Sequence, residues 1–205
     1  MKEDPLNIIV SGVGGQGNIQ ASHIIALAAV KDGLYASVGE TYGAAQRGGS
    51  VMSHVRLSQQ MQYGPLIPKG KAHVILGFEP VECLRAMGEF GNRETRVIVN
   101  SRPVYPIDVL SGETTYPEIN KVLNAIKGLA HSVYVVEATE LAKEAGNTIV
   151  QNIVMVGCLV ASGFTPIKTE TVREVIKEVF AEKNLELNMK AFDLGMKEFM
   201  RAKSL

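Results

Sequence analysis

Short apolar runs alternate with amphipathic stretches along most of the chain. Runs of about four to eight apolar residues are typical of buried strands, whereas apolar residues that recur every three or four positions indicate one face of a helix. Alternation of these two patterns predicts β–α–β units, which build a parallel sheet covered by helices. We therefore expect one α/β domain over residues 1–205, with a mostly parallel sheet and helices on both faces.

The same patterns place the individual elements. The expected strands cover 6–10, 35–40, 51–58, 72–78, 95–100 and 132–138. The expected helices cover 18–32, 79–90, 117–130, 139–146, 147–162, 169–180 and 184–203. Residues 51–58 alternate in polarity, which predicts a half-exposed strand that is antiparallel or at an edge of the sheet. Residues 147–162 are apolar nearly all round, which predicts a helix buried in the core or in a subunit interface.

Composition and charge exclude several classes of function. Apolar residues make up 46% of the chain and charged residues 20%, and the 21 basic residues balance 21 acidic ones. A balanced charge gives no overall field that would attract nucleic acid or an acidic membrane, so we expect neither partner. The N-terminus does not read as a secretory signal, and we expect a cytoplasmic protein.

The chain has only two cysteines, Cys83 and Cys158, and they lie far apart in the sequence. An iron–sulfur cluster or a structural zinc site needs more thiolates, or thiolates together with histidines, at close spacing. We therefore expect no metal site in this chain, and two buried thiols rather than a disulfide.

A glycine cluster, "SGVGGQG" (residues 11–17), follows the first expected strand directly. Gly12, Gly14 and Gly17 match the G-x-G-x-x-G pattern of Rossmann-like domains. There the first glycine permits a tight turn, the second lets a ligand approach the backbone, and the third lets the helix pack closely on the strand. The first helical turn then presents N–H groups to an anion. The alternative is that these glycines serve packing only.

A simple NAD-binding domain is one hypothesis, because Glu40 lies near the position of a ribose-binding acid. Two observations weaken it. A second glycine-rich stretch follows Glu40, and no downstream Cys, His–Asp or Lys–Tyr arrangement suits hydride transfer. The alternative to an enzyme is a stand-alone nucleotide-binding module. The segment "RPVYP" (residues 102–106) follows a strand end, where open α/β sheets place ligands, although it can equally serve packing.

The two glycine stretches, "GVGGQG" and "GETYGAAQRGGSVMSHVR", are together more specific than either alone. The pair resembles the small, gamma-type subunit of the 2-oxoacid:ferredoxin oxidoreductases. The continuation "GPLIPKGKAHVILGFEPVECLRAM", "VIVNSRPVYP" and "TELAKEAGNTIVQNIVMVGCLVASG" is similar to the indolepyruvate branch of that family, from about residue 7 to the last helix. Tyr42 stands where the family pattern has a histidine, so no imidazole role is assigned to this position.

The resemblance implies a Rossmann-like domain and a reaction. An arylpyruvate such as indolepyruvate would be oxidatively decarboxylated with coenzyme A to an arylacetyl-CoA, with reduction of ferredoxin; a pyruvate or 2-oxoglutarate enzyme is the alternative within the family. Thiamine diphosphate, Mg and iron–sulfur clusters are implied for a large alpha subunit, because this chain lacks a "GDG" motif and enough cysteines. We expect a non-redox subunit that is inactive alone, joins the alpha subunit and through it meets ferredoxin, with a homodimer as one form of the isolated chain.

The resemblance also suggests roles for the two glycine stretches. The first is the candidate anion or coenzyme A phosphate site, made of Gly12, Gly14, Gly15, Gln16, Gly17 and Asn18. The second is the candidate docking or coenzyme A loop, made of Glu40, Thr41, Tyr42, Gly43, Gln46, Arg47, Gly48, Gly49 and Ser50. Within it, Arg47 offers a rigid donor fork for a carboxylate of the alpha subunit or a phosphate of coenzyme A. No catalytic residue is assigned to this chain.

Overall fold

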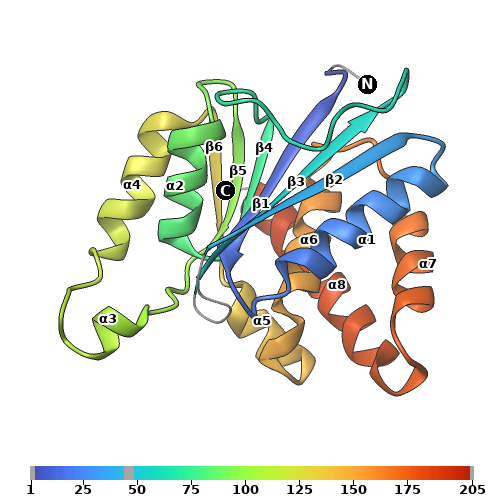
Figure 1. Ribbon diagram of the computed structural model, residues 1–205. Helices are drawn as coiled ribbons and strands as arrows, with labels where there is room; N and C mark the ends of the chain where they lie inside the picture. Colours follow the sequence, from blue (N-terminus) through green and yellow to red (C-terminus); the bar gives the residue numbers. More distant parts are fainter. Residues whose placement is uncertain (1–2, 44–48, 204–205) are drawn as a thin grey trace.

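The computed structural model describes residues 3–43 and 49–203 (Figure 1). These residues form a six-stranded sheet in the order β2-β3-β1-β4-β5-β6. The strands are β1 (Leu6–Val13), β2 (Tyr35–Tyr42), β3 (Ser50–Ser58), β4 (Val74–Gly77), β5 (Arg96–Asn100) and β6 (Ser132–Val136). The β1–β4, β4–β5 and β5–β6 pairs are parallel, so the prediction of a mostly parallel sheet is confirmed.

Helices cover both faces of the sheet, as predicted. Helices α2 and α4 lie on one face, and α1, α6, α7 and α8 lie on the other (Figure 1). The helices are α1 (Asn18–Lys31), α2 (Pro80–Phe90), α3 (Ile107–Leu110), α4 (Ile119–Leu129), α5 (Ala138–Ala145), α6 (Gln151–Ser162), α7 (Thr169–Val179) and α8 (Glu182–Lys203), with a 3-10 turn η1 (Thr148–Val150) before α6. The short helix α3 was not predicted. None of the helices within the described ranges is long and apolar enough to cross a membrane.

Strand β3 is the exception to the parallel arrangement. It lies between β1 and β2 and is antiparallel to both, which confirms that part of the prediction. Its place between two strands excludes an edge position. The strand is not half-exposed either, because on the face predicted to be outward His54 is buried and Met52 and Arg56 are only partly exposed. His54 packs edge-on against Phe90 of α2, and its Nδ1 atom accepts a hydrogen bond from the Ile67 N–H group. Contacts from distant segments therefore cover a face that the local pattern marks as polar.

Helix α6 is buried within the chain, as its apolar sequence predicts. It packs against α8, and two glycines let the helix backbones touch: a Cβ atom on Gly157 would lie 2.3 Å from the Phe192 carbonyl oxygen, and one on Gly195 would lie 2.0 Å from the Val154 carbonyl oxygen. Such distances leave no room for any side chain. Packing against α8 thereby fixes the position of α6, whose first turn lies beside the glycine loop.

Candidate glycine-loop site

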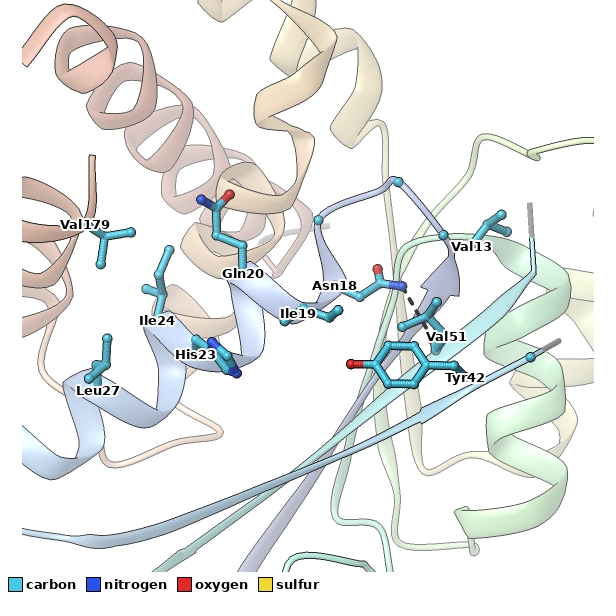
Figure 2. Close-up of a pocket in the computed structure, with 14 residues that line it drawn as sticks. Val13, Asn18, Ile19, Gln20, His23, Ile24, Leu27, Tyr42, Val51 and Val179 are labelled. Atoms are coloured by element: carbon cyan, nitrogen blue, oxygen red, sulfur yellow. Dashed lines mark hydrogen bonds between the residues drawn. The ribbon is translucent and has the colours of Figure 1, made fainter. Parts of the chain in front are cut away.

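The first glycine stretch forms the loop between β1 and α1 and borders a pocket of about 1160 Å³, here called the α1 pocket (Figure 2). One end of the pocket is the backbone of the loop, and the other is apolar. Figure 2 shows Ile24 and Leu27 on α1 facing Val179 of α7 across the apolar end. The full lining is Val13, Gly14, Gly15, Gly17, Asn18, Ile19, Gln20, His23, Ile24, Leu27, Tyr42, Gly43, Val51 and Val179.

The first and third glycines of the motif act differently from the expectation. Gly12 makes no tight turn, because β1 continues through Val13 and pairs Gly12 with Val51 of β3. Gly17 precedes α1 with φ +81°, in the left-handed region that favours glycine. A Cβ atom on Gly17 would lie 2.6 Å from the Asn152 Nδ2 atom. The close packing at Gly17 therefore joins the loop to α6, rather than α1 to its strand.

Gln16 holds the shape of the loop. Its side chain is buried, its Oε1 atom accepts a hydrogen bond from the Val13 N–H group at 2.7 Å, and its Nε2 atom donates to the Phe78 carbonyl oxygen at 3.0 Å. Phe78 directly follows β4, so the side chain ties the loop to the neighbouring strand end. Both ends of this amide are engaged by the protein itself, which makes Gln16 a structural brace.

Asn18 begins α1 and lies on the floor of the α1 pocket. It is 3% exposed, and its Nδ2 atom points to the Val51 carbonyl oxygen at 3.5 Å (Figure 2). Its Oδ1 atom is buried and has no hydrogen-bond partner among the described residues. A buried polar atom without a partner is unusual in a folded protein and marks this point of the loop for a bound water or ligand.

The N-terminus of α1 suits an anion. The residue before the helix, Gly17, has no side chain that could cap it, and the first turn carries no acidic residue. The first N–H groups of a helix lack partners within the helix and carry its positive partial charge. One donor of the loop is already used, because the Gly14 N–H group donates to the Gly49 carbonyl oxygen at 2.9 Å. The loop can therefore hold an anion through the α1 turn, and not through the Gly14 amide.

The second glycine stretch folds back onto the first. Glu40, Thr41 and Tyr42 end β2, and the Gly43 N–H group donates to the Ser50 carbonyl oxygen at 2.8 Å, which continues the pairing with β3. Gly49 contacts the first loop through Gly14, as described above. Three other members of the predicted docking loop lie outside the described residues: Gln46, Arg47 and Gly48. The structure thus brings both ends of the second stretch to the first loop.

Glu40 is engaged by neighbours on the protein. Its Oε1 atom lies 3.3 Å from the exposed His23 Nε2 atom, and its other oxygen accepts a hydrogen bond from the Tyr42 hydroxyl, which raises the pKa of Tyr42. In a dinucleotide-binding domain, β2 lies directly beside β1. Here β3 separates them, so Glu40 sits one strand further from the glycine loop. This order disfavours the NAD hypothesis.

The two thiols do not fit an iron–sulfur cluster. Both are fully buried, and burial raises the pKa of each thiol. Cys83 belongs to the apolar cluster with α2, whereas Cys158 belongs to the cluster on the α6 side of the sheet. Within the described part of the chain, no three His, Cys, Asp or Glu side chains are grouped closely enough to hold a metal ion.

Comparison with known proteins decides the family. Residues 7–198 match the family described as "Pyruvate ferredoxin/flavodoxin oxidoreductase". The chain belongs to this family. Two relatives are 41% and 42% identical to it, the "Indolepyruvate oxidoreductase subunit IorB" of Pyrococcus horikoshii and that of Archaeoglobus fulgidus. The alignments cover 96% of both chains for the first and 93% of both for the second, so family membership extends over nearly the whole length.

Solved structures of the same family share the fold. The gamma subunit of a keto/oxoacid ferredoxin oxidoreductase from Geobacter sulfurreducens has a TM-score of 0.69 and 26% identity, covering 96% of this chain and 99% of that one. A 2-oxoglutarate:ferredoxin oxidoreductase from Magnetococcus marinus has a TM-score of 0.73 and 26% identity, covering 99% of this chain but 32% of that one. The family resemblance and the gamma-type fold are therefore confirmed.

Sequence reasoning found the loop but missed its supports. Asn152 contacts Gly17, and His23 pairs with Glu40, yet neither partner lies near the other in the sequence. No local spacing signals such contacts, because they arise only when α6 and β2 pack against α1. The crevice on the far side of the loop, described below, is lined by members of the predicted glycine stretch and of the 102–106 segment, whereas Thr139 and Gln151 on its lining were not singled out.

Proposed function

We propose that residues 1–205 form the non-redox, gamma-type subunit of a cytoplasmic enzyme that oxidatively decarboxylates an arylpyruvate, with indolepyruvate as the main substrate. Coenzyme A takes up the arylacetyl group, and ferredoxin takes up the electrons. The observation that carries this proposal is the graded similarity. Indolepyruvate oxidoreductase subunits are 34–42% identical to the chain, whereas related ketoisovalerate and pyruvate enzyme subunits are 25–27% identical.

The redox groups are assigned to a partner alpha subunit. Thiamine diphosphate with Mg supplies the electron sink for decarboxylation, and iron–sulfur clusters carry single electrons to ferredoxin. Two fully buried thiols on opposite faces of the sheet support the assignment, because they cannot share a cluster. Related longer chains support it as well: this chain spans 35% of a ketoisovalerate oxidoreductase subunit from Methanothermobacter thermautotrophicus and 32% of the Magnetococcus marinus enzyme.

The α1 pocket is proposed as the place where the chain meets coenzyme A. A phosphate group is attracted by the N–H groups of the first α1 turn, where Gly17 offers no capping side chain. The apolar end of the pocket, between α1 and Val179, suits the non-phosphate part of the same molecule. In support, the Magnetococcus marinus structure was solved with coenzyme A and succinyl-CoA bound.

The test of function is substrate choice by the native complex. The chain is purified with its natural partner, and reduction of a low-potential dye is followed with coenzyme A and a panel of 2-oxoacids. We expect indolepyruvate and phenylpyruvate to give a kcat/KM at least tenfold above that for pyruvate or 2-oxoglutarate. A preference for either small 2-oxoacid would place the chain in another branch of the family.

The test of the α1 pocket is Gly14→Val in the assembled complex. A bulky side chain in the loop should raise the KM for coenzyme A, while circular dichroism shows an intact fold. Gly64→Val is the matched control, because Gly64 also lies in a loop and a Cβ atom there would meet nothing within 4 Å. Equal KM values in the two folded variants would leave the glycine loop with a packing role only.

A further inference from the structure

A second pocket, of about 370 Å³, lies across the glycine loop from the α1 pocket and is here called the crevice pocket. Its lining includes Gly15 after β1, Arg102 after β5 and Thr139 after β6. It therefore lies outside the carboxyl ends of the strands. The chain runs from β1 toward β2 on one side of the sheet and from β4 toward β5 on the other, so the strand order reverses between β1 and β4, and the pocket lies beside that point. Open α/β sheets bind ligands at such points.

Two hydrogen-bond donors in this pocket have no partner among the described residues. Arg102 is exposed, and no carboxylate among the described side chains forms an ion pair with its guanidinium. Gln151 lines the same pocket at the start of α6, and its Oε1 atom accepts a hydrogen bond from the Thr139 hydroxyl at 2.9 Å. That bond orients the amide, and no described residue accepts a hydrogen bond from the Gln151 Nε2 atom. The lining thus offers a cation and an oriented N–H group.

A buried polar network supports these donors from below. Thr139 is 5% exposed and accepts a hydrogen bond from the Asn100 Nδ2 atom at 3.1 Å. The same Nδ2 atom and the Gln16 Nε2 atom both donate to the Phe78 carbonyl oxygen. Asn100 is 1% exposed, and its Oδ1 atom has no partner in the described part of the chain. The network joins four separate segments and holds Thr139, and through it Gln151, in a fixed orientation.

Glu79 directly follows Phe78 of this network in the sequence, but it does not neutralise Arg102. Its carboxylate accepts hydrogen bonds from the Tyr116 hydroxyl and from the N–H groups of Glu82 and Val104. Burial raises the pKa of Glu79, which lowers its tendency to carry charge. Glu79 is thus held by other donors and forms no ion pair with Arg102.

We propose that the crevice pocket is a second oxyanion site of this chain, which binds a phosphate group through the Arg102 guanidinium and the Gln151 Nε2 atom. The guanidinium fork matches two phosphate oxygens, and the amide N–H group fixes a third direction. Gly15 lines both this pocket and the α1 pocket, so one ligand with two separated phosphate groups can reach both. Coenzyme A has that chemistry, and in this respect the inference rests on the proposed function.

The experiment measures phosphate binding directly on the full chain. Inorganic phosphate is titrated into the ¹⁵N-labelled protein at constant ionic strength, and the amide signals of Gly15, Thr139 and Gln151 are followed. We expect saturable shifts of these signals, a Kd at least tenfold higher in Arg102→Ala, and an unchanged Kd in Arg93→Ala. Arg93 is the matched control: it is an exposed arginine just before β5, whereas Arg102 follows it, and it donates to the Gly128 carbonyl oxygen.

A second variant tests the amide without disturbing the network. Gln151→Glu keeps an acceptor for the Thr139 hydroxyl and places a negative charge at a helix start, where it is tolerated. It should weaken phosphate binding at least as much as Arg102→Ala does. Shifts that do not saturate, or equal Kd values in Arg102→Ala and Arg93→Ala, would overturn the proposal.

A further arm identifies the source of the phosphate. Coenzyme A and dephospho-coenzyme A, which lacks the 3′-phosphate, are titrated into the same proteins. An effect of Arg102→Ala on coenzyme A alone assigns the pocket to the 3′-phosphate, and an equal effect on both assigns it to the diphosphate; either supports the site. The readout does not depend on turnover. If phosphate causes no shift of these amide signals while arylpyruvate turnover is normal, only this inference is refuted. If phosphate binds but arylpyruvate is not turned over, only the proposed function is refuted.

Discussion

Replacement of Gly17 by alanine tests whether the glycine loop is shaped by its contact with α6. Alanine in the left-handed region costs about 1–2 kcal/mol, because Cβ crowds the following carbonyl group. Here φ is +81°, and the new Cβ atom would also lie 2.6 Å from the Asn152 Nδ2 atom and 2.8 Å from its Cγ atom. The amide of Asn152 must then move, although it donates to the Gln20 Oε1 atom at 2.9 Å. Loss of that hydrogen bond costs about 0.5–1.5 kcal/mol.

The free energy of unfolding should therefore fall by about 2–4 kcal/mol in Gly17→Ala, with remaining overpacking included. Gly15→Ala isolates the backbone term, because φ is +101° there and a Cβ atom would meet nothing within 4 Å. It should cost about 1–2 kcal/mol. Urea unfolding at constant pH measures both values. For a chain of this size, about 1 kcal/mol corresponds to a shift of roughly 2–4 °C in Tm.

The double variant separates strain from collision. Asn152→Ala removes the amide that the new Cβ atom would meet, although the Cβ atom of residue 152 would still lie 3.0 Å away. In that background Gly17→Ala should cost little more than the backbone term, so the cycle should give a coupling of about 1 kcal/mol between the two positions. Equal destabilisation by Gly15→Ala and Gly17→Ala, with no coupling to Asn152, would refute the reasoning. The α6 contact would then not be the cause of the glycine at position 17.

Three further predictions concern the core. Burial lowers the pKa of His54, so below about pH 6.5 the unfolded chain binds more protons than the folded chain. The free energy of unfolding should therefore fall as the pH is lowered from about 7 to about 5, and less steeply in His54→Gln, which urea titrations at these pH values measure. Cys83 and Cys158 should react with a thiol reagent only after unfolding, since both are fully buried. Gly157→Ala should cost about 3 kcal/mol in urea unfolding, because its Cβ atom would meet an α8 carbonyl oxygen at 2.3 Å, whereas the open helical Gly128→Ala should cost nothing.

The order of elements could be predicted from local patterns, and their arrangement only in part. The expected helix over 79–90 matches α2, and the expected strand over 95–100 matches β5, because short-range apolar spacing reports which face of a segment is buried. The position of β3 between β1 and β2 depends on pairing between residues about forty apart, such as Gly12 with Val51. His54 shows the same limit: its polar character predicted exposure, whereas a distant segment covers it.

The site was predictable as a location and not as a set of contacts. The glycine pattern placed a loop between a strand and a helix, and the structure has it there. Gln16, however, reaches the end of β4, which only the folded sheet brings beside the loop. Thr139, Gln151 and Arg102 line one pocket at the carboxyl ends of the strands. They come from three separate segments, so no spacing in the sequence signals that they lie together. The role predicted for Arg47 stays a prediction, since that residue lies outside the described ranges.

The central claim is that this chain completes an arylpyruvate oxidoreductase whose redox groups lie in a partner subunit. The most direct measurement is a titration of the separated partner with the purified chain, in the presence of indolepyruvate, coenzyme A and ferredoxin. The account predicts no ferredoxin reduction by the chain alone, and a rate with the partner that rises and saturates at a fixed molar ratio. Ferredoxin reduction by the chain alone, or a rate that does not change as the chain is added, would contradict the account.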